Sequence, residues 1–187
     1  MTTATQTRTS TWTIDPTHSI VEFAVKHLVV TTVKGRFREL EGALQIDEAR
    51  PEIASVSASI DVASIDTNVA DRDAHLRSDD FFNAERYPKI TFQSTGVERV
   101  DDTNYRVRGD LTIRDVTKPV VLDTEFEGQV DDPWGKRRAA FTATTQISRK
   151  EFGVRWNQLI ESGGAVVGDN VKITLHIEAI RQGDRES

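Results

Sequence analysis

One short stretch of the chain gathers the residue types that acid–base chemistry needs. It contains Arg72, Asp73, His75 and Asp80 in close succession. An imidazole near a carboxylate can act as a general acid or base, so His75 with Asp73 or Asp80 is a candidate catalytic pair. The same residues also suit an exposed helix, because Asp73 and Arg77 lie four positions apart in the order that favours an ion pair. We favour this structural interpretation, which needs only local contacts, and predict no catalytic residue.

The histidines could also act as metal ligands. His18, His27, His75 and His176 are scattered along the chain, and no two have the helical spacing of a zinc enzyme. The chain has no cysteine, which excludes disulfides, thiolate metal sites and cysteine nucleophiles. No glycine-rich phosphate-binding loop is present. The sequence therefore predicts no metal site.

The acid–base stretch belongs to the one segment with a convincing helical pattern. We expect a short helical insert around residues 68–83, with Asn68 as its N-cap. Val69 and Leu76 give this insert a narrow apolar stripe, and Pro88 prevents its continuation. An insert between segments that have the pattern of strands is placed to cover one end of a sheet.

The rest of the chain alternates between apolar and polar residues, the pattern of half-buried strands. The clearest example is Val56, Ala58, Ile60 and Val62, with polar residues between them. About eight such segments are joined mostly by short links, which favour antiparallel neighbours. We therefore predict an all-β fold, an extended eight-stranded antiparallel up-and-down barrel.

Two places interrupt the alternation. Residues 28–33 break its phase and are expected to form a loop or a short helix. Phe37 is one residue out of phase with Leu40, which predicts a bulge between them. A bulge would bend this strand as a closed sheet requires.

Length and charge limit the classes of function. The 187 residues are enough for one domain, expected from residue 11 to 181, with disordered tails at 1–10 and 182–187. The net charge of −6 without a basic block makes nucleic acid an unexpected partner. No apolar run reaches about 18 residues, so no integral membrane segment is expected. The polar N-terminus lacks the apolar core of a signal peptide, which predicts a cytoplasmic protein.

An eight-stranded barrel can be filled by its own side chains or hold one small ligand. Several inward positions carry small residues, among them Gly42, Ala58, Gly109 and Thr124. Solid cores also mix large and small residues. The pattern alone therefore leaves a packed core and a ligand-binding tube equally open.

A set of short motifs occurs in order along the chain. Among them are Trp12-x-Ile14-Asp15-Pro16-x-His18-Ser19, Ile65-Asp66-Thr67, Arg72-Asp73-x-His75-Leu76, Tyr87-Pro88-x-Ile90-x-Phe92 and Val116-Thr117-Lys118-Pro119-Val120. The ordered set resembles the YceI-like, polyisoprenoid-binding family over nearly the whole chain, from Trp12 to Ala179. The resemblance implies a lipocalin-like barrel whose apolar lumen encloses a long isoprenoid chain.

The resemblance further implies a soluble binding protein that needs no cofactor. Its ligand would be a polyisoprenoid or a similar long-chain amphipathic lipid, such as an isoprenoid phosphate or a quinone, held for carriage, storage or sequestration. The residues predicted to line the lumen are Phe23, Val25, Phe37, Leu44, Ile46, Ala58, Ile60, Phe92, Leu111, Ile113, Leu122, Phe126, Phe141, Ile147, Trp156 and Leu175.

The head group and two rival functions remain as hypotheses. A phosphate would need cationic or amide donors at the barrel mouth, and Arg36, Lys118 and Arg149 are candidates by motif position. One rival is an enzyme that acts on an isoprenoid or an ester through His75 and a neighbouring carboxylate. The other is an interaction module that forms a homodimer through an exposed strand face.

Overall fold

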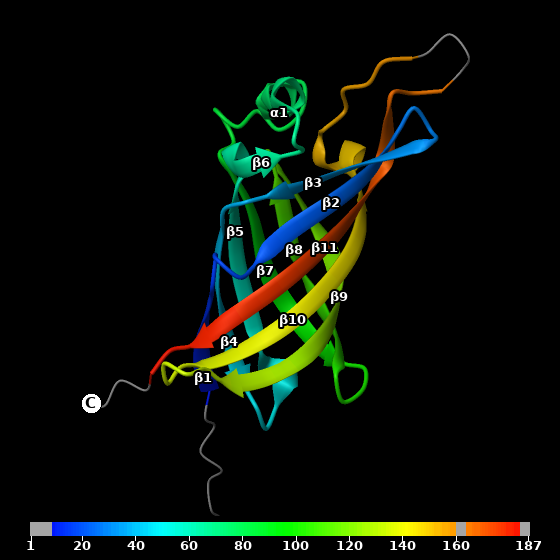
Figure 1. Cartoon of the computed structure of the whole chain (residues 1–187). Helices are drawn as coiled ribbons and strands as arrows, with labels where there is room; N and C mark the ends of the chain where they lie inside the picture. The colour runs from blue at the N-terminus through cyan, green and yellow to red at the C-terminus, as the bar shows by residue number, and fades with distance from the viewer. Residues whose placement is uncertain (1–8, 160–163, 184–187) are drawn as a thin grey trace, which may run out of the picture.

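The computed structural model describes residues 9–159 and 164–183, most of which form one antiparallel barrel (Figure 1). The strands are β1 (Thr9–Ile14), β2 (Ile20–His27), β3 (Thr31–Phe37), β4 (Leu40–Asp47), β5 (Ser55–Asp61), β6 (Ile65–Asp66), β7 (Lys89–Arg99), β8 (Asn104–Ile113), β9 (Val116–Asp131), β10 (Arg137–Ser148) and β11 (Val167–Arg181). The helical elements are the α-helix α1 (Ala70–Arg77) and the 3-10 helices η1 (Pro51–Ile53), η2 (Val62–Ser64) and η3 (Arg149–Phe152).

The barrel closes through the ring β1-β4-β5-β7-β8-β9-β10-β11, because β11 pairs back onto β1. Every pairing in this ring is antiparallel. The ring has the eight positions and the up-and-down order that the alternation predicts, so the predicted fold class is confirmed. Closure pairs the strand edges that an open sheet would expose.

The first long strands of the barrel are broken into two halves. β2 continues β1 after a kink at Asp15 and Pro16, and both halves pair with β11. Residues 38 and 39 lie between β3 and β4 and belong to neither strand, so the strand breaks where a bulge between Phe37 and Leu40 is predicted. η2 separates β5 from β6, which pairs with β3. These breaks let β2, β3 and β6 bend around one end of the barrel.

The segment 28–33 differs from its prediction. Only residues 28–30 form a turn, and strand β3 begins at Thr31, opposite His27. Val33 lies in the ladder opposite Val25, so the expected loop or helix as far as Val33 is wrong. Pairing with β2 overrides the weak local alternation at this position.

The helix α1 forms within the predicted insert, but its start is held differently. Val69 is the N-cap and makes no side-chain cap hydrogen bond, whereas Asn68 has a positive φ of 64°, so the predicted Asn68 cap is wrong. The buried Asp73 carboxylate instead accepts hydrogen bonds from the N–H and the hydroxyl of Thr67. Arg77 donates to the Ala63 and Ile65 carbonyls rather than to Asp73, so the predicted ion pair is wrong as well. Both side chains take tertiary partners that the local spacing does not reveal.

The barrel extends slightly beyond the predicted domain bounds. β1 begins at Thr9, opposite Asp47, and Ser10 Oγ accepts a hydrogen bond of 2.8 Å from the indole of the fully buried Trp12. Near the other terminus, the Gln182 N–H donates to the Thr11 carbonyl at 2.8 Å. These contacts place residues at the inner ends of both predicted tails in the barrel; residues 1–8 and 184–187 lie outside the described ranges.

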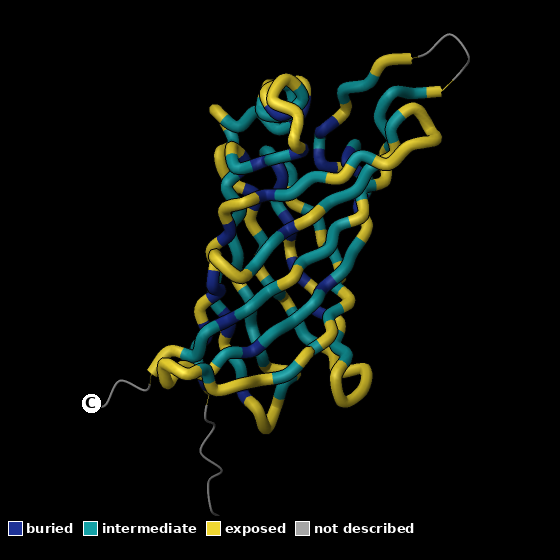
Figure 2. Tube along the Cα trace, viewed as in Figure 1, coloured by how far each residue is buried: buried dark blue, intermediate teal, exposed yellow. Residues whose placement is uncertain are grey.

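The two ends of the barrel carry different elements. At the end called upper here lie α1, the β2–β3 turn (residues 28–30) and the segment from η3 to residue 159; the β7–β8 and β9–β10 turns lie at the lower end (Figure 1). The buried residues lie along the barrel wall and beneath α1, and the yellow, exposed residues lie at the turns and at alternate positions along the strands (Figure 2). Within the described ranges, no helix is both long enough and apolar enough to span a membrane.

Candidate ligand-binding cavity

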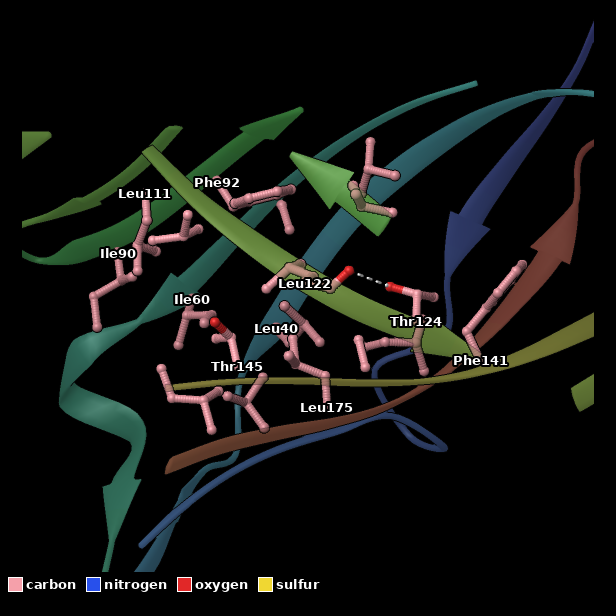
Figure 3. Close-up of a pocket in the computed structure, with 18 of the residues that line it drawn as sticks. Leu40, Ile60, Ile90, Phe92, Leu111, Leu122, Thr124, Phe141, Thr145 and Leu175 are labelled. Carbon is pink, nitrogen blue, oxygen red and sulfur yellow. Dashed lines mark hydrogen bonds between the residues drawn. The ribbon is translucent and has the colours of Figure 1, made fainter. Parts of the chain in front are cut away.

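An elongated cavity of about 580 Å³ occupies the lumen of the barrel. Side chains from many strands point into it, among them Leu40, Ile60, Leu111, Phe141 and Leu175 (Figure 3). The cavity wall reaches from residues of the insert at the upper end to residues of η1 and its neighbours at the lower end. This volume falls within the range of about 300–1,000 Å³ that is typical of small-molecule sites. The barrel is therefore hollow rather than packed solid.

Most of the residues predicted to line the lumen do line this cavity. They are Phe23, Val25, Phe37, Leu44, Ile46, Ala58, Ile60, Phe92, Leu111, Ile113, Leu122, Phe126, Phe141, Ile147 and Leu175. Trp156 is not among the lining residues and packs instead on His75 and Phe81, with ring centroids 4.8 and 5.3 Å away. The alternation of apolar and polar residues locates these positions because a closed sheet turns every second residue toward the lumen.

Several lining residues were missed at the sequence level. Val21, Val107 and Val120 follow the same alternation as their predicted neighbours, so completing the pattern would have found them. Phe81 and Phe82 come from the segment after α1 and close the upper end of the cavity. No periodic signal marks them, because this segment is neither helix nor strand.

Two glycines allow aromatic rings to lie flat against the barrel wall. A Cβ at Gly35 would sit 2.4 Å from Phe23 Cζ, and a Cβ at Gly109 would sit 2.4 Å from Phe92 Cζ. Each ring therefore covers the backbone of a glycine on the neighbouring strand. This packing keeps two large side chains at the wall and leaves the lumen open.

The lumen holds a few polar groups along its apolar wall. Thr124 Oγ1 donates to the carbonyl of Leu122 at 3.3 Å (Figure 3). Thr145 lies on β10 among apolar side chains, and its hydroxyl makes no hydrogen bond within the described residues. Thr145 can therefore offer a hydrogen bond to a bound molecule at mid-lumen.

The acid–base stretch does not form one cluster. Asp73 is buried against Thr67, whereas His75 Nε2 lies 2.8 Å from Asp80 Oδ2 at the surface. Side chains of His75 and Asp80 are 40% and 52% exposed, and neither lines the cavity. His75 packs its ring edge-to-face against Phe81, 5.0 Å away between centroids. The pair therefore packs behind Phe81, which lines the upper end of the cavity.

The head-group candidates lie in different places. Arg36 and Lys118 are not among the residues that line the cavity, and Arg36 lies 3.6 Å from the carboxylate of Asp66. Arg149 does line the cavity and is 5% exposed. Its role as a phosphate contact stays a prediction, and the hydrogen bonds of Arg149 bear directly on it.

The guanidinium of Arg149 is surrounded by backbone carbonyls. Nε donates to Gly168 at 2.7 Å, and Nη1 donates to Val154 and Trp156, each at 2.9 Å. Nη2 donates to Val167 at 3.2 Å and lies 3.8 Å from the Asp169 carboxylate. Burial lowers the pKa of Arg149, and Asp169 opposes this shift. The hydrogen bonds clamp the segment after η3 onto the start of β11 and leave little donor capacity for a ligand.

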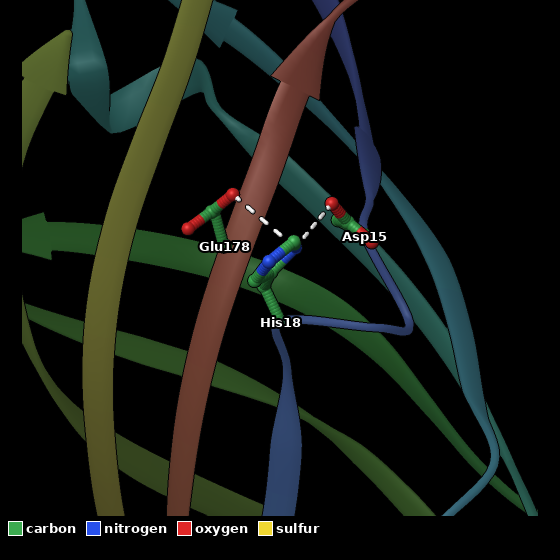
Figure 4. A group of neighbouring side chains, drawn as sticks. All are labelled: Asp15, His18 and Glu178. Atoms are coloured by element: carbon green, nitrogen blue, oxygen red, sulfur yellow. Dashed lines mark hydrogen bonds and ion pairs between the residues drawn. The ribbon is translucent and has the colours of Figure 1, made fainter. Parts of the chain in front are cut away.

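A second group of ionisable residues lies where β1 kinks into β2. Single ligand atoms of Asp15, His18 and Glu178 all lie within 4.8 Å of one another, and His18 Nδ1 is 2.9 Å from Asp15 Oδ2 (Figure 4). Arg138 Nη1 lies 2.8 Å from the same Asp15 oxygen and also pairs with Glu178. The guanidinium supplies the positive charge that a metal ion would supply. The geometry therefore favours an ion-pair network that ties the kink to β10 and β11.

Replacing Asp15 with asparagine should lower the free energy of unfolding by about 1–3 kcal/mol near neutral pH, because Arg138 loses a charged partner. Hydrogen bonds from Thr17, then from His18 and Arg138, hold the pKa of Asp15 well below its ordinary value. A lowered pKa contributes stability above the unfolded-state value of about 4, and this contribution is lost as the pH falls below it. Urea unfolding should therefore show the difference between wild type and Asp15→Asn shrinking as the pH falls below about 4. A difference that stays constant with pH would contradict this assignment.

Comparison with known proteins gives a consistent result. The family model of the YceI-like domain matches residues 12–179. The protein YceI of Shigella flexneri is 39% identical over 165 residues, which cover 88% of this chain and 83% of the relative.

Solved structures match the same fold. The crystal structure of BcnA from Burkholderia cenocepacia has a TM-score of 0.78 at 24% identity and covers 88% of this chain and 98% of its own. A polyisoprenoid binding domain from Saccharophagus degradans has a TM-score of 0.70 at 16% identity, covering 91% of this chain and 98% of its own. At these identities, the matches support the barrel architecture.

Proposed function

The chain belongs to the YceI-like domain family, and on that premise we propose that it binds a long-chain lipid of the polyisoprenoid class inside the barrel. The observation that carries the proposal is the hollow, apolar, elongated lumen. A tube of this shape suits one extended hydrocarbon chain better than a compact ligand. The related fold of the Saccharophagus degradans polyisoprenoid binding domain supports the same class of ligand.

The energetics of burial are sufficient for such a ligand. Burying apolar chain contributes about 0.8 kcal/mol for each methylene. Association costs about 4–15 kcal/mol in lost freedom. An isoprene unit has five carbons and contributes about 4 kcal/mol, so about one to four units offset this cost and longer chains bind more tightly. Carriage, storage or sequestration of such a lipid would each require this type of enclosure.

We propose a neutral head group for a ligand that is wholly enclosed. The cations in the described cavity wall are Arg99 and Arg149. Arg149 is committed to backbone carbonyls, and Arg99 donates to the carbonyl of Asp101 and the carboxylate of Asp102. A quinone ring or an alcohol needs no cation, whereas an enclosed phosphate would remain without a partner charge. The proposal is for binding rather than catalysis, since the His75–Asp80 pair lies outside the cavity wall.

Native mass spectrometry tests the proposed function directly. Protein incubated with a dispersed polyisoprenoid alcohol should gain the mass of one lipid, because the lumen has room for one chain. A single-unit isoprenoid alcohol serves as the control and should not be retained, since it buries too few methylenes. Failure to take up any long-chain isoprenoid lipid, neutral or phosphorylated, would contradict the proposal.

A further inference from the structure

The turn between β2 and β3 exposes three consecutive aliphatic side chains. Leu28, Val29 and Val30 are 40%, 65% and 77% exposed, at the far tip of the two strands. The turn projects from the upper end of the barrel, and its exposed residues appear yellow at the upper right (Figure 2). A run of exposed aliphatic residues is unfavourable in water unless it serves an interaction.

The backbone of this turn is also strained. Leu28 and Val29 have φ values of 51° and 68°. Asparagine and glycine are the residues that turns favour at consecutive positive φ values, and a β-branched residue there is a genuine outlier. The chain therefore keeps Leu28 and Val29 at a cost in both strain and exposure. Strain of this kind concentrates at functional segments.

A basic patch lies on the outer face directly below the turn. Lys34 on β3 and Lys172 on β11 are both opposite Ala24 on β2, and Lys26 is two residues further along β2 on the same face. All three lysines are exposed, and none makes an ion pair within the described residues. The patch is positive although the whole chain carries a net charge of −6.

Two acidic residues border this patch, Glu22 on β2 and Asp169 on β11. Glu22, on the same face of β2, lies 4.0 Å from His176. Asp169, at the start of β11, lies 3.0 Å from Lys150 and 3.8 Å from Arg149. The three lysines outnumber these two acidic residues and make no ion pair with either of them, so they can contact an external anionic surface.

We propose that the turn and the basic patch together dock the barrel onto an anionic lipid bilayer. The aliphatic turn would insert at the boundary of the acyl chains, and Lys26, Lys34 and Lys172 would contact the anionic headgroups. A bilayer fits better than a protein groove because the apolar element is a convex tip flanked by cations.

Docking through the β2–β3 turn would bring the upper end of the lumen close to the bilayer, from which a lipid could enter it. Val25 and Val167 line the cavity, and Val167 lies opposite His27, the residue before the turn. The strands that carry the docking tip are thus walls of the cavity. This inference rests on the proposed lipid binding, and it assigns the upper end of the barrel as the route of exchange.

Vesicle flotation tests the docking surface, with phosphatidylcholine vesicles compared with vesicles of phosphatidylcholine and phosphatidylglycerol. Wild type should bind the anionic vesicles and lose this binding as salt is added. Leu28→Asn combined with Val29→Gly should weaken binding by about tenfold or more. The same variant should melt higher by about 3 °C, because asparagine and glycine relieve the strained turn. Neutralising Lys26, Lys34 and Lys172 with glutamine should cost about fivefold for each lysine.

Matched controls come from the lower end of the barrel. Trp134 is 80% exposed in the β9–β10 turn, and Lys136 beside it is also exposed. Trp134→Ser and Lys136→Gln remove the same kinds of group and should leave vesicle binding unchanged. Equal losses in these controls, or undiminished binding by the turn variant, would overturn the proposal.

A further readout separates docking from lipid binding. Uptake of dispersed polyisoprenoid alcohol, read by native mass spectrometry, should be the same for wild type and the turn variant. If wild type takes up lipid but ignores anionic vesicles, docking is wrong and the proposed function stands. If wild type binds vesicles through the turn but takes up no lipid, the proposed function fails instead.

A turn variant that changes self-association in sedimentation, rather than vesicle binding, would identify a second copy as the partner and overturn the proposal.

Discussion

Replacing Ala58 with tryptophan should leave the barrel folded and abolish lipid uptake. Ala58 lines the cavity on β5, between the neighbouring strand residues Gly42 and Phe92. The indole would enter space that the lipid occupies in the wild type. Because the lumen is hollow, the free energy of unfolding should change by less than about 1 kcal/mol, whereas overpacking a solid core costs about 1–3 kcal/mol.

A matched control sits at the adjacent position. Ser57 is exposed on the opposite face of the same strand, so Ser57→Trp adds the same side chain outside the barrel. Native mass spectrometry should show normal uptake for Ser57→Trp and none for Ala58→Trp. Urea unfolding should give similar free energies of unfolding for Ala58→Trp and Ser57→Trp. A strongly destabilised Ala58→Trp variant, together with a wild type that takes up no lipid, would argue for a packed core.

The wall of the barrel was predictable because alternation is a local signal. Strands β7 and β8 show the alternation of apolar and polar residues from which the barrel is predicted. Each inward residue on these strands faces the lumen through the pleat alone. The empty volume of that lumen was not predictable, because it depends on where the aromatic side chains pack against the wall. The flat placement of Phe92 over Gly109 becomes visible only in three dimensions.

Several contacts lie outside the reach of local spacing rules. Asp15 and Arg138 are 123 positions apart, and no spacing rule connects them. Asp73 was expected to pair along its helix with Arg77, but it turns inward to Thr67. The left-handed turn at Leu28 contradicts local propensity, so the sequence pattern could not predict its shape. Sequence reasoning fails at these positions because tertiary partners or backbone strain outweigh local preference.

Local sequence is also a poor guide to Arg149. Its motif position suggests a phosphate contact, whereas its hydrogen bonds to backbone carbonyls indicate a structural clamp. Replacing Arg149 with methionine should lower the free energy of unfolding by about 3–5 kcal/mol. The reason is that carbonyls from Val154, Trp156, Val167 and Gly168 lose their donor, and an unsatisfied buried polar group costs about 1–3 kcal/mol. Urea unfolding gives this difference directly.

The neighbouring residue provides the control that separates a clamp from a charge. Lys150 pairs with Asp169 at 3.0 Å and is exposed enough that Lys150→Met should cost less than about 1 kcal/mol. Hydrogen exchange should quicken at the amides of residues 154–156 in Arg149→Met and stay unchanged in Lys150→Met, because only the former releases that segment. Any remaining lipid uptake by Arg149→Met should fall equally for a polyisoprenoid phosphate and its alcohol. A selective loss of the phosphate would instead make Arg149 a head-group contact, and the neutral head group proposed for the enclosed ligand would then be wrong.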